Sequence, residues 1–169
     1  PQRDFAGYTN ITYYLYRTCT VNSGTIITIP QGTVFKSTNI NCFDVEGGMI
    51  IKGTEADPVI FTHESDDDYG NPMDTNEDGD DSDPSIVNRY HLDFADISND
   101  TSMVRHAIFR FCNAGINLRQ ASPKIKSSRF EYSDWGVVLN GVSAPVVDSN
   151  TFHNLTYSPM LISLVSYPV

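Results

Sequence analysis

The stretch Ser122-Pro-Lys-Ile-Lys-Ser-Ser-Arg-Phe130 returns 22 residues later as Ala144-Pro-Val-Val-Asp-Ser-Asn-Thr-Phe152, with apolar and aromatic residues at matching positions. Upstream, the segment Val104–Phe109 precedes Ile125–Phe130 by 21 residues and carries the same pattern. Self-similarity at a fixed period between about 20 and 50 residues is the sequence signature of a repeat fold. Three consecutive repeats are therefore visible in the carboxy-terminal half.

The second half of each repeat follows the same spacing. Gly115-Ile-Asn-Leu118 returns 21 residues later as Gly136-Val-Val-Leu139, and Pro159-Met-Leu-Ile162 lies 23 residues beyond that. Each repeat contains short runs of alternating apolar and polar residues, separated by Gly, Asn, Ser and Pro, which is typical of strands. A period near 22 is too short for a propeller blade and lacks leucine-rich spacing. We therefore predict stacked coils about 4.8 Å apart, with Phe130 and Phe152 in one interior column.

The amino-terminal half alternates in the same way with less regularity. Its expected strands are Thr25–Ile29, Thr33–Phe35, Phe43–Val45, Met49–Ile51 and Val59–Thr62. The sequence thus predicts one all-β domain over residues 1–169, a right-handed parallel β-helix of about six to seven coils. Between about residues 64 and 84 the pattern gives way to Asp, Asn, Gly and Ser, which predicts a long acidic loop inserted between coils. Loops of this length are usually functional or disordered.

Composition restricts the partners. The chain has 40% hydrophobic residues, enough for a packed interior, and a net charge of −10. This acidity argues against nucleic acid or an anionic membrane surface as a partner, because both attract Lys and Arg. No stretch reaches the roughly 18 to 20 apolar residues that span a bilayer. Three cysteines, Cys19, Cys42 and Cys112, allow either one disulfide with a leftover thiol or three buried thiols.

A series of motifs in fixed order resembles a known group of proteins. The series contains Ile29-Pro-Gln-Gly-Thr-Val-Phe35, Val45-Glu-Gly47, Gly53-Thr54, Pro58-Val-Ile-Phe-Thr62, the acidic segments Asp66-Asp-Asp-Tyr-Gly70 and Asp74-Thr-Asn-Glu-Asp-Gly79, and then the repeats. In this order the chain resembles the right-handed parallel β-helix repeat domains, of the pectate-lyase-like superfamily, in large secreted and cell-surface bacterial proteins. The resemblance implies the fold and a secreted or cell-surface location far better than it implies an activity.

The acidic loop contains the start of a calcium-binding pattern. Asp74, Asn76 and Asp78 place oxygen ligands at alternate positions, with Gly79 and Asp80 next. Ser85 stands where such a loop has its bidentate Glu, so the shell must be completed by other carboxylates. The candidates are Asp83, Asp66, Asp67 and Asp68. Hard oxygen ligands without nearby His or Cys favour Ca²⁺. The alternative is a solvated loop that only keeps the protein soluble.

An enzymatic role is the alternative to a structural or adhesive module. A polysaccharide lyase needs a Lys or Arg base, for which the candidates are Lys124, Lys126, Arg105, Arg110 and Arg129. A glycoside hydrolase needs two carboxyl groups, available among Asp134, Asp148, Glu131, Asp93 and Asp96. Arg105 and Arg129 occupy repeat positions beside core residues, so we expect them to point outward from strands. We assign no catalytic residue.

Three aromatic residues near the carboxy terminus suggest a sugar ring as a ligand. Trp135, with Tyr132 and Tyr157 on adjacent coils, could form a platform for polysaccharide, and core or turn packing is the alternative.

The segment Ser163–Val169 lacks a polar or helical cap. Because open coil ends expose unpaired backbone, we expect either further chain beyond it, with this sequence a fragment, or self-assembly end to end.

Overall fold

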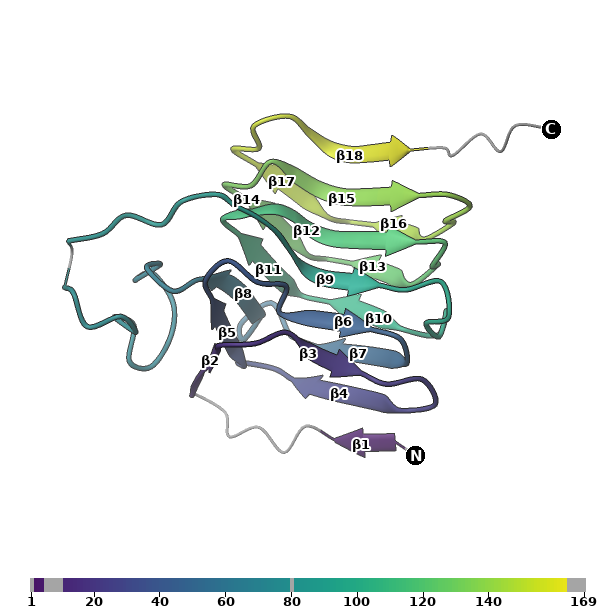
Figure 1. Ribbon diagram of the computed structural model, residues 1–169, viewed down its shortest axis with the longest axis horizontal. Coiled ribbons are helices and arrows are strands. Elements are labelled where there is room, and N and C mark those ends of the chain that lie inside the picture. Colours follow the sequence, from purple (N-terminus) through teal and green to yellow (C-terminus); the bar gives the residue numbers. More distant parts are fainter. Residues whose placement is uncertain (1, 5–10, 80, 164–169) are drawn as a thin grey trace.

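Three parallel sheets form the molecule (Figure 1). The computed structural model describes residues 2–4, 11–79 and 81–163. Sheet A contains β1 (Gln2–Asp4), β4 (Ile26–Pro30), β7 (Gly48–Lys52), β10 (Met103–Arg105), β13 (Lys124–Lys126) and β16 (Val146–Asp148). Sheet B contains β2 (Thr12–Leu15), β5 (Val34–Ser37), β8 (Val59–His63), β11 (Ala107–Arg110), β14 (Arg129–Glu131) and β17 (Thr151–His153). Sheet C contains β3 (Cys19–Val21), β6 (Phe43–Val45), β9 (Val87–Phe94), β12 (Cys112–Arg119), β15 (Trp135–Asn140) and β18 (Ser158–Ser163).

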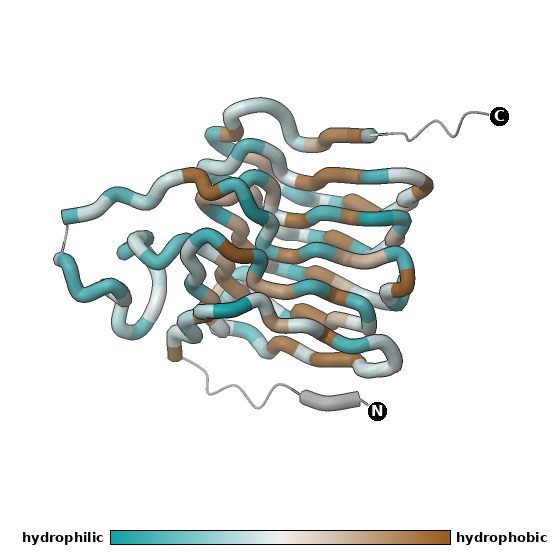
Figure 2. The backbone as a smooth tube through the Cα atoms, in the orientation of Figure 1, coloured by the Kyte–Doolittle hydropathy of each residue, from teal (hydrophilic) through white to brown (hydrophobic). Residues whose placement is uncertain are grey.

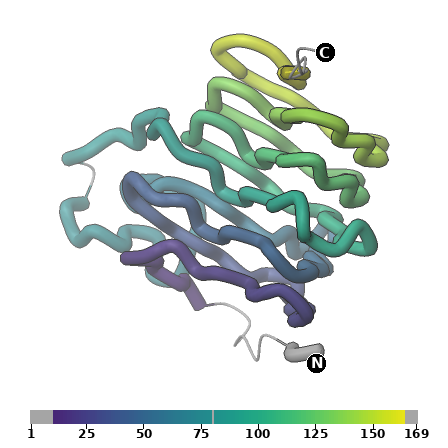
Figure 3. Tube along the Cα trace, turned by 45° about the vertical axis from the view of Figure 1, so that its right-hand side comes forward, coloured from purple at the N-terminus to yellow at the C-terminus, as the bar shows by residue number. Residues whose placement is uncertain are grey.

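The chain visits sheets A, B and C in turn, so each coil adds one strand to every sheet, and the coils stack along one axis (Figures 1 and 3). The registers reproduce the repeats of the sequence. Ile125 pairs with Val147 and Phe130 with Phe152, both 22 residues apart, and Val137 pairs with Met160, 23 residues apart. The predicted parallel β-helix is therefore confirmed. The described residues contain no helix that could cross a membrane.

One aromatic ring from each strand of sheet B forms a continuous interior stack, here called the aromatic ladder. Its members, in order along the axis, are Tyr13, Phe35, Phe61, Phe109, Phe130 and Phe152. The four Phe–Phe steps have ring centroids 5.2, 5.1, 5.0 and 5.1 Å apart and nearly parallel planes. The coil spacing thus sets a stacking distance within the favourable range for aromatic pairs. The predicted column of Phe130 and Phe152 is confirmed.

Two glycines of the repeat make room for the ladder. A Cβ atom on Gly115 would lie 2.7 Å from Cδ1 of Phe130, and one on Gly136 would lie 2.4 Å from Cε1 of Phe152. Real Cβ atoms do not approach other heavy atoms this closely. Glycine therefore recurs at this position because the ladder ring of the next coil packs directly against the backbone.

The residue after each ladder ring points out of sheet B, because side chains alternate along a strand. These residues form what we call the polar column: Tyr14, Lys36, Thr62, Arg110, Glu131 and His153. The acidic insert begins directly after β8 and returns to the helix at β9, so it spans residues 64–86. It projects from one side of the stack (Figures 1 and 3) and is mostly hydrophilic in Figure 2. The predicted insertion between coils is confirmed.

Candidate metal centre in the acidic insert

The insert is anchored on the polar column of sheet B. The Tyr14 hydroxyl donates a hydrogen bond to Glu64, and the Thr62 hydroxyl donates one to Asp66. Burial, together with the Glu64 carboxylate, raises the pKa of Tyr14. Strands β2 and β8 therefore present donors to the first residues of the insert.

Arg110 makes the strongest of these attachments. Its Nη1 donates to both carboxylate oxygens of Asp66 at 2.8 Å, and its Nη2 donates to Asp68 Oδ2 at 2.7 Å. Arg110 and Asp66 are only 5% and 2% exposed. Burial alone would lower the pKa of Arg110, but the carboxylates of Asp66 and Asp68 outweigh it and raise that pKa. This is a buried ion pair with good geometry, the kind that is costly to break from one side.

Aromatic rings enclose the same guanidinium. Its central carbon lies 5.1 Å from the ring centre of Tyr69, 4.8 Å from that of Phe111 and 5.2 Å from that of Tyr132. Each distance is within the range of a cation–π contact. Tyr69 belongs to the insert, whereas Phe111 and Tyr132 lie at the ends of neighbouring strands. Arg110 therefore ties the insert to two coils of the helix.

Lys36 provides a second buried cation beneath the insert. Its side chain is fully buried, donates to the carbonyl of Met73, and lies 3.9 Å from Oδ1 of Asp67. Burial lowers the pKa of Lys36, and the nearby carboxylates, Asp67 first, oppose that effect. The ammonium group therefore lies beside the acidic cluster described next.

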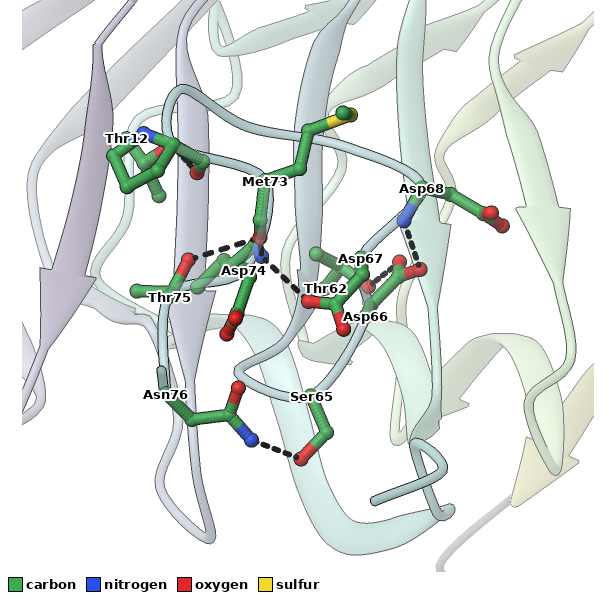
Figure 4. A network of polar contacts seen from close by, with 12 residues as sticks. Thr12, Thr62, Ser65, Asp66, Asp67, Asp68, Met73, Asp74, Thr75 and Asn76 are labelled. Atoms are coloured by element: carbon green, nitrogen blue, oxygen red, sulfur yellow. Dashed lines mark hydrogen bonds and ion pairs between the residues drawn. The ribbon is translucent and has the colours of Figure 1, made fainter. Parts of the chain in front are cut away.

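Three carboxylates of the insert come together. Asp67, Asp74 and Asp78 each place one oxygen within 4.8 Å of the others. Asn76 joins them, because its Nδ2 donates to Asp78 Oδ2 at 2.8 Å. In Figure 4 the side chains of Asp67, Asp74 and Asn76 point toward the same space. We call these four residues the acidic cluster.

Several oxygens of the acidic cluster are buried without a hydrogen-bond partner in the described part of the chain. They are the Oδ1 atoms of Asp74, Asn76 and Asp78. The second polar atom of each side chain is satisfied within the insert: Gly79 N donates to Asp74 Oδ2 at 3.0 Å, and the Ser82 hydroxyl donates to Asp78 Oδ2. Buried oxygens normally have a partner, so each exception needs an explanation. A hard cation among these oxygens would satisfy them all.

The predicted ligands divide into two groups. Asp74, Asn76 and Asp78 lie together as the alternate spacing predicts. Asp66 and Asp68 instead bind Arg110, and Asp83 is exposed in a recess of about 290 Å³ beside Phe111. Asp80 lies outside the described residues. The carboxylate that joins the cluster from the first acidic run is Asp67, which the sequence offered only as one of three adjacent aspartates.

The three residues of the predicted aromatic platform do not all lie together. The Trp135 and Tyr157 rings are stacked with centroids 4.8 Å apart, and Tyr157 is 64% exposed. Tyr132 stacks instead on Phe111, at 5.5 Å, and faces Arg110. Only Trp135 and Tyr157 therefore form a common surface on sheet C.

A groove follows the corner between sheets A and B through four consecutive coils. It has a volume of about 390 Å³ and an apolar floor that includes Ile108. Its hydroxyl and imidazole groups come from Thr54, His106, Ser127, Ser128, Ser149 and Thr151. Arg129 lines its edge, where Nε lies 3.0 Å from a carboxylate oxygen of Glu131. The outward positions expected for Arg105 and Arg129 are confirmed, since both are exposed.

Two of the three cysteines and one histidine, His91, are buried. All three cysteines are free thiols, with Cys42 and Cys112 buried. The sulfur of Cys42 lies 3.3 Å from Nδ1 of His91, whose Nε2 lies 2.8 Å from the Arg110 carbonyl. Burial raises the pKa of Cys42 to about 12 and lowers the pKa of His91 to about 4. Both groups are therefore neutral near pH 7, and Cys42 is not a nucleophilic thiolate.

Comparison with known proteins returns no match among protein-family models, curated proteins or solved structures. The fold assignment therefore depends on the registers and the aromatic ladder described above.

Proposed function

We propose that this chain is an extracellular structural or adhesive β-helix module, of the pectate-lyase-like superfamily, whose insert binds one calcium ion. The observation that carries the calcium proposal is a set of three buried Oδ1 atoms, on Asp74, Asn76 and Asp78, which have no hydrogen-bond partner among the described residues. The stacked coils provide a rigid body, and the ion fastens the distal part of the insert to it. Support for export comes from the order of sequence motifs and from the solenoid fold.

Calcium fits the donor set better than other common metals. Three carboxylates and one amide oxygen are hard ligands, and Ca²⁺ accepts six to eight oxygens in flexible geometry, so water and main-chain carbonyls complete its shell. The acidic cluster contains no His or Cys, which zinc and copper prefer. Mg²⁺ demands near-ideal octahedral geometry at shorter distances.

Calcium titration of the intact chain by calorimetry tests the proposal. The expected result is one ion per chain, with a stability gain of about 2.7 kcal/mol when free Ca²⁺ exceeds Kd a hundredfold. The variant Asp74→Asn should lose most of this binding, whereas Asp96→Asn, an equal change of charge outside the insert, should retain it. Absence of binding to the wild-type chain at millimolar Ca²⁺ would exclude the proposal.

A second candidate function is binding of a neutral polysaccharide, and the groove along sheets A and B favours it. Hydroxyl groups recur there from coil to coil over an apolar floor, as expected for a linear, hydroxyl-rich ligand lying along the axis. The stacked pair Trp135 and Tyr157 offers an alternative surface for a sugar ring. Glycan-array binding with the variants Ser127→Trp and Tyr157→Ala separates the two surfaces. If no neutral glycan binds the wild-type chain, this candidate is excluded.

A further inference from the structure

Arg110 sorts three consecutive aspartates of the insert. It binds the first and the third, Asp66 and Asp68, through separate nitrogens at 2.7 to 2.8 Å. The middle carboxylate, Asp67, does not bind Arg110; it lies near Lys36 and within 4.8 Å of the other cluster carboxylates. One guanidinium therefore holds both neighbours of the residue that completes the acidic cluster.

Other contacts hold this arrangement from both sides. The Thr62 hydroxyl donates to Asp66, and the Asp68 amide donates to Asp66 Oδ1 at 3.4 Å. On the helix side, the Arg110 carbonyl contacts His91 Nε2, and its guanidinium lies over Phe111 and Tyr132. Most of these partners belong to strands or their ends. The β-helix itself therefore holds the Arg110 side chain in place, independently of the insert.

We propose that Arg110 is a positioning residue for the calcium site, which aims Asp67 at the ion by holding Asp66 and Asp68 away from it. The inference rests on the proposed function. Without Arg110, three adjacent carboxylates compete for one ion and repel one another. Partners that orient metal ligands typically change metal affinity by about 10- to 100-fold when they are removed.

The variant Arg110→Lys tests this role at constant charge. Lysine keeps the cation but cannot bind a carboxylate through a rigid fork. The matched control is Arg119→Lys, whose parent arginine pairs with Asp93 on sheet C at 3.0 Å and has no ion pair with the described residues of the insert. We expect Ca²⁺ affinity to fall about 10-fold or more in Arg110→Lys and to stay within about twofold in Arg119→Lys.

The neutral variant Arg110→Gln separates an electrostatic role from a positioning role, because the two predict opposite changes in Ca²⁺ affinity. In Arg110→Gln a positive charge near the ion is lost, so electrostatics alone would tighten Ca²⁺ binding. Positioning predicts weaker binding despite this gain. Should either arginine variant fail to fold, Thr62→Val removes one hold on Asp66 with little change of shape, and affinity should still fall.

The outcomes are distinct. If the wild-type chain binds no calcium, the proposed function fails. If the wild-type chain binds calcium and folded Arg110→Lys, Arg110→Gln or Thr62→Val binds it equally well or more tightly, the positioning role is overturned while the calcium site stands.

Discussion

The aromatic ladder and the acidic insert are built on the same strands of sheet B but are held in opposite ways. The ladder lies inside, where Phe35, Phe61, Phe109 and Phe130 are fully buried and each ring contacts the next at a constant spacing. The insert lies outside and is held by a few charged groups, chiefly Arg110 and Lys36. The ladder is stabilised by the same ring contact repeated from coil to coil, whereas the insert is held in place by a few individual residues.

The difference shows how a repeat fold can carry a specific site. Within the ladder, one side chain of similar size serves in every coil, because the burial of apolar surface is not directional. In the polar column, the same repeat position holds Lys36, Thr62 and Arg110 in turn. Lys36 donates to the Met73 carbonyl, whereas Thr62 and Arg110 both donate to Asp66. Interior regularity therefore leaves the outward positions free to differ between coils.

Removal of a ladder ring should have the largest effect. Phe109→Ala deletes a fully buried ring between Phe61 and Phe130, and we expect a loss of about 3 to 5 kcal/mol in the free energy of unfolding, measured by urea denaturation. Phe111→Ala, outside the ladder, should cost about 1 kcal/mol through its lost stacking on Tyr132. Equal losses at the two positions would contradict the ladder's role.

Lowering the pH should reduce the stability of the fold through the buried side chain of His91. Burial holds the pKa of His91 at about 4, below its ordinary value of 6.5, so the unfolded chain takes up this proton first as the pH falls. Stability should therefore decline by up to about 3 kcal/mol between pH 6.5 and pH 4. His91→Gln should lack this component, and urea midpoints of both proteins across this range measure it. Parallel pH profiles would contradict the prediction.

Breaking the buried ion pair from one side should have a somewhat smaller effect. Asp66→Asn leaves Arg110 with Asp68 and Glu131 as its remaining carboxylate partners, and we expect a loss of about 2 to 3 kcal/mol. Asp68→Asn should cost less than about 1 kcal/mol, because the Asp68 side chain is 69% exposed. Thermal unfolding in calcium-free buffer compares the two variants, and a reversed order would show that the insert is not anchored through Asp66.

The ladder could be predicted from the sequence and the anchoring of the insert could not. The spacing of Phe130 and Phe152 gave both the register and the interior position, because equivalent residues of a solenoid must overlie one another. Asp74, Asn76 and Asp78 lie close together for a similar reason, since alternate residues in a tight loop converge. Asp66, Asp67 and Asp68 are chemically identical, and only the position of Arg110, 44 residues beyond Asp66, distinguishes them.

The strands of the first coil could not be predicted individually from the sequence, for a physical reason. Strands β2 and β3 have no well-matched repeat in the sequence, and Tyr13 takes the place of a phenylalanine in the ladder. The tilt between Tyr13 and Phe35, 35° at a centroid distance of 5.6 Å, shows that this coil follows the stack less closely.

Hydrogen exchange with and without Ca²⁺ tests the contrast between the two regions most directly. Mass spectrometry of the intact chain should show that calcium slows exchange in peptides covering residues 71–86, while peptides from β8, β11 and β14 keep the same protection. Uniform slowing over the whole molecule, or no change in the insert at saturating Ca²⁺, would contradict the view that an ion fastens the insert to a helix that is already stable.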